Sequence, residues 1–182
     1  MSTGKVTLYI AASVDGYIAD DDGGVEWLDE FEQDSANGDI ADAYEEFFAS
    51  IDCLVMGATT YEQILTFGEW PYGDRPTYVL THRDLPRATD AVEFVDGDIG
   101  SVATELEREY DHTWLVGGAQ LARKFLDANH VDELRLSLIP VLLGSGIPLF
   151  ERNDETYGLQ HLDTRTYDSG IVELHYEVTA RR

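Results

Sequence analysis

The chain has 182 residues, of which 43% are hydrophobic, so it can bury a real core and is not disordered throughout. It carries 12 Lys and Arg against 36 Asp and Glu, a formal net charge of −24, which makes nucleic acids and anionic membranes poor partners. The single cysteine, Cys53, excludes an internal disulfide, and no apolar run spans a membrane or marks a signal peptide, so we expect a cytoplasmic protein without a metal centre.

The acidic residues are spread along the whole chain, and the lysines are Lys5 and Lys124 alone. A carboxylate-coated surface of this kind repels itself at low salt. At molar salt the Debye length falls to about 3 Å and the repulsion is screened. We therefore expect a cytoplasmic protein of a halophilic organism. Screening also means that the net charge does not exclude an anionic ligand.

The first half of the chain alternates strands with helices. An apolar run predicts a buried opening strand over Val6–Ala12. Apolar residues at helical spacing predict a helix over Asp39–Ser50, with its first residue as the cap. A second buried strand follows at Cys53–Met56. Thr59 and Glu62 then form a capping-box pattern that is expected to open a helix.

The second half continues the alternation and ends differently. Its predicted order is strand, strand, helix, strand, helix, strand and a closing hairpin: Thr77–Leu80, Val92–Val95, Ser101–Tyr110, Thr113–Val116, residues 121–128, Glu133–Ile139, Leu159–Thr166 and Ile171–Thr179. Alternating strands and helices favour one α/β domain over residues 1–182, with a largely parallel sheet and an antiparallel end.

The strongest local motif is Gly117-Gly118, between an apolar strand and an amphipathic helix. Glycine lets a main chain approach a phosphate closely, and a helix N-terminus offers free N–H groups. The alternative is a tight strand-to-helix turn without a ligand, and spacing alone does not decide between them.

Two weaker motifs follow other strands. Gly57 and Thr59 also stand between a strand and a helix, although simple capping by Thr59 is the better explanation of this motif on its own. Thr81, His82 and Arg83 follow the next strand, where a hydroxyl, an imidazole and a guanidinium can bind a phosphate monoester. Arg83 is equally consistent with a solvated surface residue.

Five segments stand in a distinctive order along the chain. They are Ile10–Ala19 with its Ser-x-Asp-Gly loop, Cys53–Glu62, Tyr78–Arg83, Trp114–Leu126 and Leu136–Phe150. In this order they resemble the dihydrofolate reductase superfamily, in the branch of the C-terminal reductase domain of bacterial riboflavin biosynthesis. The resemblance implies a three-layer α/β fold with a central, mostly parallel sheet, helices on both faces and an antiparallel C-terminal hairpin.

The resemblance also implies an NADPH site. It would place the pyrophosphate on the main chain of Gly117, Gly118, Ala119 and Gln120. The adenosine 2′-phosphate would meet Thr81, His82 and Arg83. Further cofactor contacts would come from Gly57, Ala58, Thr59, Ala11 and Ala12, the last two lying against the nicotinamide.

The same resemblance implies a substrate pocket bordered by Ser13, Asp15, Trp27 and Phe150. Ser13 and Asp15 are the candidate catalytic residues, and either Asp15 or a bound water would supply the proton. Two positions depart from the pattern of the resemblance: Tyr9 stands where riboflavin-pathway reductases often carry a lysine, and Ala58 stands where the superfamily commonly has an arginine.

Together these features predict a reductase that transfers a hydride from NADPH to a small planar heterocycle, resembling 5-amino-6-(5-phosphoribosylamino)uracil reductase. The alternatives are a reductase of another small substrate, dihydrofolate reductase proper, or a non-catalytic NADP-binding dimeric module. The resemblance further implies a homodimer formed through the late strand and the hairpin.

Overall fold

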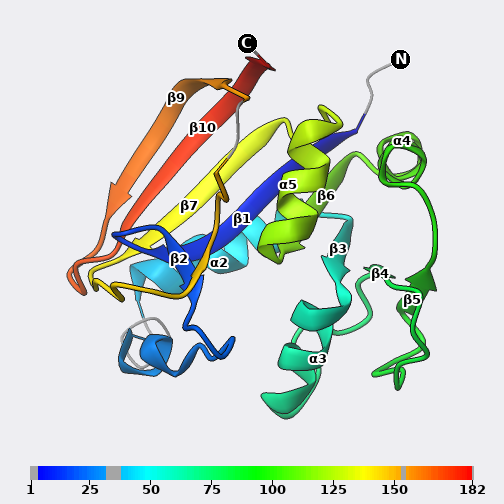
Figure 1. Cartoon of the computed structure of the whole chain (residues 1–182), viewed down its shortest axis with the longest axis horizontal. Coiled ribbons are helices and arrows are strands. Elements are labelled where there is room, and N and C mark those ends of the chain that lie inside the picture. The colour runs from blue at the N-terminus through cyan, green and yellow to red at the C-terminus, as the bar shows by residue number, and fades with distance from the viewer. Residues whose placement is uncertain (1–3, 32–37, 153–154, 182) are drawn as a thin grey trace. The chain divides into compact units, whose positions relative to one another are not determined.

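The computed structural model describes residues 4–31, 38–152 and 155–181 (Figure 1). The chain divides into two compact units, each built from two stretches of sequence. The first unit holds residues 1–8 and 51–132, and the second holds residues 9–50 and 133–182. Strand β1 (Lys5–Ser13) contributes its first residues to the first unit and the rest to the second. That residues 1–182 form one domain stays a prediction.

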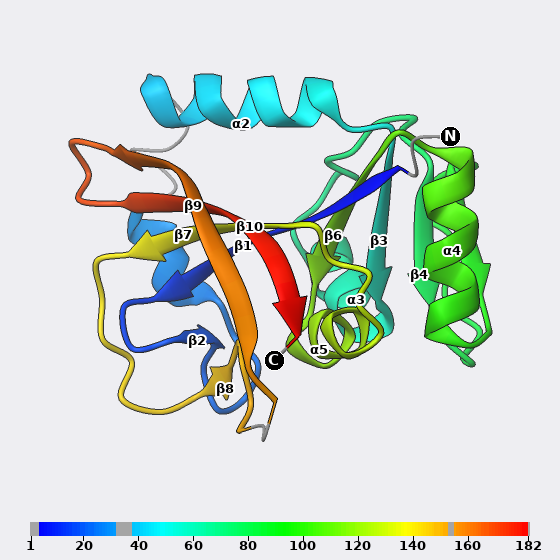
Figure 2. The same cartoon turned by 90° about the horizontal axis from the view of Figure 1, so that it is seen from above.

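The first unit is a parallel sheet. Its strands run in the order β5-β4-β3-β6-β1, and every neighbouring pair among them is parallel. Figure 2 shows β3, β4 and β6 pointing the same way. Besides the start of β1, the strands are β3 (Cys53–Gly57), β4 (Thr77–Leu80), β5 (Val92–Val95) and β6 (His112–Gly117).

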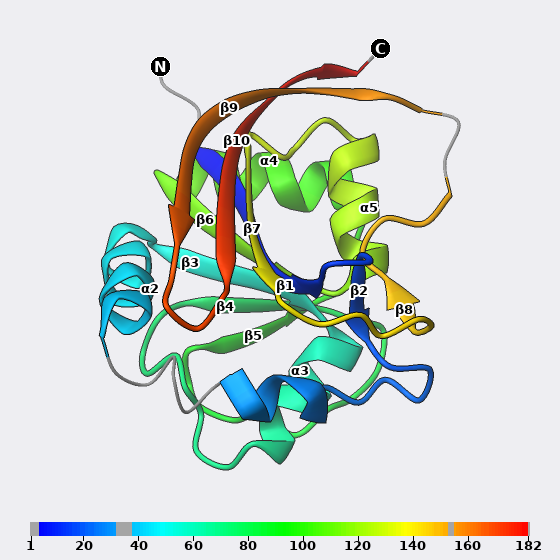
Figure 3. The same cartoon turned by 90° about the vertical axis from the view of Figure 1, so that its left-hand side faces the viewer.

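Helices cover both faces of this sheet, as Figure 3 shows for α3 on one side and α4 and α5 on the other. The helices are α3 (Ala58–Thr66), α4 (Ile99–Glu109) and α5 (Ala119–Asp127). Because both faces are covered, β3 is buried along its apolar residues, including the free thiol of Cys53. Burial raises the pKa of that thiol to about 12, which makes Cys53 a core residue rather than a nucleophile.

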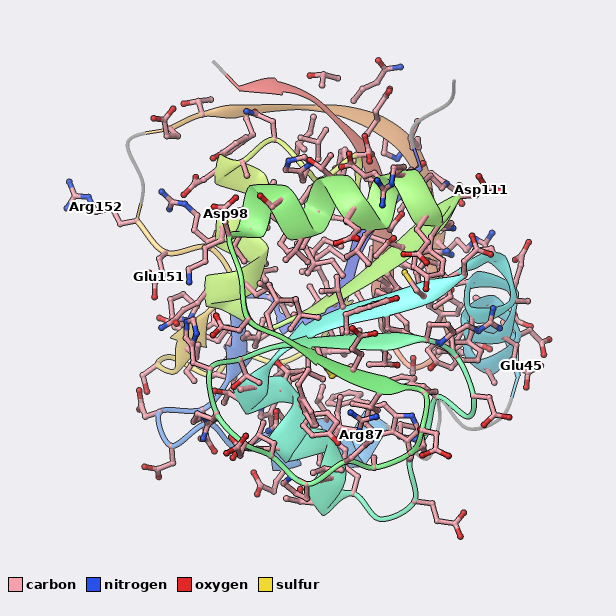
Figure 4. All side chains as sticks on the ribbon, turned by 90° about the vertical axis from the view of Figure 1, so that its right-hand side faces the viewer. Glu45, Arg87, Asp98, Asp111, Glu151 and Arg152 are labelled. Carbon is pink, nitrogen blue, oxygen red and sulfur yellow. The ribbon has the colours of Figure 1, made fainter. Side chains whose placement is uncertain are left out.

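The starts of α3 and α4 differ from each other. The predicted capping box is wrong, because Thr59 is already inside α3 and Gly57 occupies the N-cap without a side-chain hydrogen bond. At α4, by contrast, the Asp98 carboxylate accepts a hydrogen bond from the Ser101 N–H (3.0 Å). Figure 4 shows Asp98 at the start of that helix. The chain therefore caps α4 with its own side chain and leaves α3 uncapped.

The second unit is antiparallel. Its larger sheet joins β7 (Glu133–Ile139), β10 (Val172–Arg181) and β9 (Tyr157–Thr166) in that order, and the last two form the predicted C-terminal hairpin. A small sheet pairs β2 (Tyr17–Ala19) with β8 (Ile147–Pro148), which the sequence did not predict.

The unit also holds helix α2 (Asp39–Ser50) and a 3-10 helix η1 (Glu26–Leu28). The bounds of α2 are those predicted, but Asp39 is its first helical residue rather than its cap.

A buried polar cluster ties β7, β10 and α2 together in the second unit. The Glu173 carboxylate accepts hydrogen bonds from Arg135 Nε (2.7 Å) and from the Tyr9 hydroxyl (2.8 Å). The Arg135 guanidinium also lies over the rings of Tyr9 and Phe47. Burial, with Glu173 adding to it, raises the pKa of the Tyr9 hydroxyl, so that group stays protonated. Tyr9 is therefore part of the hydrogen-bonded core of this unit.

The predicted fold class is confirmed. The chain has a mixed α/β fold with a mostly parallel sheet, flanking helices and a C-terminal antiparallel hairpin. Within the described ranges, no helix has both the length and the apolarity needed to cross a membrane.

Candidate functional site

Two helices of the first unit begin side by side at the carboxyl end of the parallel sheet. Strands β3 and β6 are neighbours, and Met56 of one is paired with Gly117 of the other. A Cβ atom added to Gly57 would lie 4.0 Å from the Gly117 carbonyl oxygen. One added to Gly118 would lie 3.3 Å from Oγ1 of Thr60. The starts of α3 and α5 therefore lie in van der Waals reach of each other.

Both of these helix starts lack a side-chain cap. Gly57 and Gly118 are the N-cap residues of α3 and α5, and neither helix has a capping hydrogen bond from its N-cap side chain. Neither has an acidic residue in its first turn, whereas α2 carries Asp39 and Asp42 there. In a chain with 36 acidic residues, these two starts present main-chain N–H groups and the positive ends of two helix dipoles, which favour an anion.

Gly117 gives the turn into α5 its shape. Its φ of +128° lies in the region that residues with a side chain rarely adopt, and the peptide bond to Gly118 is cis. Ala119 is buried and Gln120 is exposed at the start of the helix. The structure thus brings together the predicted pyrophosphate residues and the second helix start at Gly57, Ala58 and Thr59.

The third predicted phosphate group follows β4, the neighbour of β3 on its other side, where Leu80 is paired with Gly57. The Thr81 hydroxyl accepts a hydrogen bond from the Arg83 N–H (3.0 Å). The Arg83 guanidinium makes two hydrogen bonds to Glu62 of α3, at 2.6 Å from Nη2 and 3.2 Å from Nη1. Arg83 is thus held beside α3 with a carboxylate as its partner.

His82 has an acidic partner as well. Its Nδ1 lies 2.5 Å from Oδ1 of Asp96, and both side chains are largely exposed. The sequence predicted the two nitrogen-bearing side chains as phosphate ligands but did not predict their carboxylates. The pairs join residues far apart in the chain, and no sequence spacing signals them.

Tyr61 holds the loop after β4 against α3. It is fully buried, its hydroxyl donates to the Pro86 carbonyl oxygen (2.7 Å), and it accepts from the Ala88 N–H (2.8 Å). The sequence analysis did not single out Tyr61, because an apolar position on a helix looks the same whether or not its hydroxyl anchors a loop. Through this anchor, α3 positions the segment that carries Arg83.

In the second unit, the loop after β1 is held by Ser13 and Asp15. Ser13 is fully buried; its hydroxyl donates to Asp15 Oδ1 (2.6 Å) and accepts from the Tyr17 N–H (2.9 Å). The Asp15 carboxylate also accepts from the N–H groups of Leu143 (3.1 Å) and Gly144 (2.7 Å). These contacts fasten the loop after β1 to the loop after β7.

The same contacts lower the pKa of Asp15, which was predicted as a possible proton source. The hydrogen bond from Ser13, helped by those from Gly144 and Leu143, holds the pKa of the Asp15 carboxyl below its usual range. A carboxylate that is stabilised in this way is a poor proton donor at neutral pH. Ser13 and Asp15 thus hold the loop after β1, and their catalytic role stays a prediction.

The other predicted residues of the second unit differ in exposure. Ala12 is buried, Ala11 is half-buried, and Phe150 is 50% exposed. Trp27 lies in η1, and its indole N–H is buried without a hydrogen-bond partner among the described residues.

The comparisons with known proteins agree with this architecture. The family model of the RibD C-terminal domain matches residues 4–173. The uncharacterized protein YwjB of Bacillus subtilis (strain 168) is 36% identical over 174 residues, covering 94% of this chain and 97% of YwjB.

Solved structures share the fold at lower identity. A putative riboflavin biosynthesis protein from Shewanella sp. PV-4 has a TM-score of 0.82 at 24% identity, over 97% of this chain and 99% of that one. A diaminohydroxyphosphoribosylaminopyrimidine deaminase/5-amino-6-(5-phosphoribosylamino)uracil reductase from Thermotoga maritima has a TM-score of 0.72 at 16% identity, over 97% of this chain and 57% of that one. Dihydrofolate reductase from Enterococcus faecalis, complexed with NADP(H), has a TM-score of 0.66 at 17% identity, over 98% of each chain.

Proposed function

The chain belongs to the RibD C-terminal domain family, and on that basis we propose that it is an NADPH-dependent reductase of a small planar heterocycle. One observation carries the proposal furthest. Helices α3 and α5 follow neighbouring parallel strands, and their starts lie close together without a side-chain cap and without an acidic residue in the first turn. Such a pair of helix starts is suited to the pyrophosphate of a dinucleotide.

The residues of the first unit fit this cofactor. The main chain from Gly117 to Gln120 would hold the pyrophosphate, with Gly57 leaving room at the second helix start. Thr81 and Arg83 would meet the 2′-phosphate of the adenosine, since Arg83 already lies beside α3 in a bidentate geometry that also suits a phosphate. The bound cofactor would supply a hydride to an electron-poor carbon of the substrate.

The second unit would position the heterocycle. Trp27 and Phe150 would border the substrate pocket, as the resemblance implies. Ser13 and Asp15 would keep the loop after β1 in place, while a water would bring the proton that completes the reduction. In this assignment the two residues act through the loop they hold and do not touch the reacting atoms.

The substrate class rests on the relatives. The matched family takes its name from RibD, and the Thermotoga maritima protein of the same fold is a 5-amino-6-(5-phosphoribosylamino)uracil reductase. A pyrimidine of this type is planar and polar at its ring edge, and the carbon of its ribosylamino group that stands at the carbonyl oxidation level can accept a hydride. We propose such a pyrimidine, or a heterocycle of similar size, as the substrate.

The test has two parts, both carried out in molar KCl. First, NADPH is titrated into the protein and binding is followed by the fluorescence of the reduced nicotinamide; saturable binding is expected. Second, loss of NADPH absorbance is followed with a panel of aminopyrimidines and with dihydrofolate. Turnover with a pyrimidine supports the proposal, and turnover with dihydrofolate alone makes the protein a dihydrofolate reductase.

Two other results contradict the proposal. Binding of NADPH without turnover of any compound in the panel favours a non-catalytic NADP-binding module. A protein that is folded, as judged by circular dichroism, but binds neither NADPH nor NADH has no dinucleotide site.

A further inference from the structure

The predicted 2′-phosphate site carries its own carboxylates, and this bears on the choice of cofactor. Building on the proposed function, we propose that Glu62 competes with the 2′-phosphate of NADPH for Arg83, and that this competition sets the preference between NADPH and NADH.

Glu62 binds Arg83 in the geometry that a phosphate would use. Both guanidinium nitrogens of Arg83 that face α3 are engaged by the two carboxylate oxygens of Glu62, at 2.6 Å and 3.2 Å. A phosphate monoester binds arginine through the same two parallel hydrogen bonds. The carboxylate of Glu62 thus occupies the face of Arg83 that a phosphate would use, and both cannot occupy it together.

The charges around Arg83 also oppose the binding of a phosphate. His82, the other predicted phosphate ligand, has Asp96 at 2.5 Å from its ring nitrogen. A 2′-phosphate entering here would meet two carboxylates, Glu62 and Asp96, besides the guanidinium of Arg83. The ribose of NADH has a hydroxyl in place of that phosphate, and a carboxylate is a good acceptor for a ribose hydroxyl. Glu62 therefore disfavours NADPH and favours NADH.

The exposure of Arg83 and Glu62 decides how strongly Glu62 changes the preference between the two cofactors. The side chains of Arg83 and Glu62 are 55% and 43% exposed. An exposed ion pair exchanges its partners at little cost. NADPH can therefore displace Glu62, and we expect the pair to reduce the preference for NADPH rather than to abolish NADPH binding.

The experiment measures dissociation constants of NADPH and NADH for the full chain and for Glu62→Gln, in molar KCl. Glutamine keeps the size of the side chain but removes the charge. The expected result is NADPH binding tighter by about twofold to fivefold, with NADH binding unchanged or weaker. The matched control is Glu105→Gln on α4, which removes an exposed acid paired with a different arginine, Arg108. It should leave the ratio of the two constants as it is in the wild type.

The outcomes separate this inference from the function it rests on. If both cofactors bind but Glu62→Gln changes their ratio no more than Glu105→Gln does, Glu62 does not set the preference, and the dinucleotide site stands. If neither cofactor binds the wild type, both proposals are overturned. A further arm uses adenosine 2′-monophosphate as the probe. Glu62→Gln should bind it more tightly than the wild type, and equal binding contradicts the competition for Arg83.

Discussion

Neighbouring glycines meet different demands at the start of α5. Gly117 has a φ of +128°, a conformation that a side chain would strain. Gly118 has φ −77° and ψ −163°, which alanine adopts without strain, and its importance lies in the space beside it. A substitution at Gly118 therefore tests the site with little disturbance of the fold.

We predict that Gly118→Ala weakens NADPH binding about tenfold, because an added methyl group keeps a phosphate away from the main-chain N–H groups of α5. The added Cβ would lie 3.3 Å from Thr60 Oγ1, so a small loss of thermal stability is also expected. Fluorescence titration measures the affinity. The matched control is Gly97→Ala before α4, whose Cβ would make an ordinary 3.6 Å contact with Val102. Equal NADPH affinities of the two variants would show that the pyrophosphate does not bind at the start of α5.

A second prediction at this scale concerns pH and Asp15. Its pKa is lowered in the folded protein, so the carboxylate stabilises the fold above the ordinary carboxyl pKa of about 3.9. That contribution is lost as the pH falls through the lowered value. Asp15→Asn should therefore be less stable than the wild type at pH 7, and the difference should shrink below about pH 4.

Urea denaturation at pH 7, 5 and 3 in constant salt measures this difference. Asp22→Asn, which removes an exposed carboxylate in the following loop, is the control. A gap between Asp15→Asn and the wild type that persists undiminished at pH 3 would show that the charge of Asp15 is not what holds the loop.

Among the elements, those with a strong local pattern were predicted with their bounds. Strands β4, β5 and β7 and helix α2 begin and end where the sequence placed them, because runs of apolar residues and helical spacing are local signals. Strands β2 and β8 were missed. They are three and two residues long and exist only through their pairing, Tyr17 with Pro148, across most of the chain.

In the candidate site too, residues with a local sequence signal were predicted and residues that depend on tertiary contacts were not. Gly117 and Gly118 were found because glycine between a strand and a helix is a local signal. The Glu62 partner of Arg83 was not found, because it depends on how β4 and α3 lie together. Thr59 was misread as a cap because Ser and Thr are common both at the N-cap and just inside a helix, and only the backbone distinguishes the two.

The pairing of β7 with β10 supports a prediction about the buried cluster. The side chains of Arg135 and Glu173 are 12% and 5% exposed, so removing one leaves the other without its counter-charge. Arg135→Met should lower the free energy of unfolding by about 3 kcal/mol at neutral pH. The double variant Arg135→Met/Glu173→Gln removes the stranded charge and should recover a large part of that loss. Urea denaturation measures both, and a double variant no more stable than the single one would contradict the account.

At the scale of the whole molecule, the net charge of −24 governs the response to salt. Repulsion between carboxylates acts over about 10 Å at 0.1 M salt and about 3 Å at 1 M. We predict that the melting temperature rises steadily between 0.1 and 2 M KCl, as a halophilic origin would require.

Differential scanning calorimetry measures this rise. A neutral osmolyte at matched osmolality is the control, since it stabilises compact states without screening charge. A melting temperature that rises equally in the osmolyte, or not at all in KCl, would mean that self-repulsion of the surface is not what limits stability.

The way the chain passes between the two units has a consequence for its synthesis. Every residue of the first unit has been translated once residue 132 is complete, whereas the second unit still awaits β7, β8 and the hairpin. The whole sequence of the first unit, with both uncapped helix starts, therefore exists on the ribosome before the C-terminal strands of the second unit are made. During that interval residues 9–50 lack β7, β8 and the hairpin, with which they form the second unit.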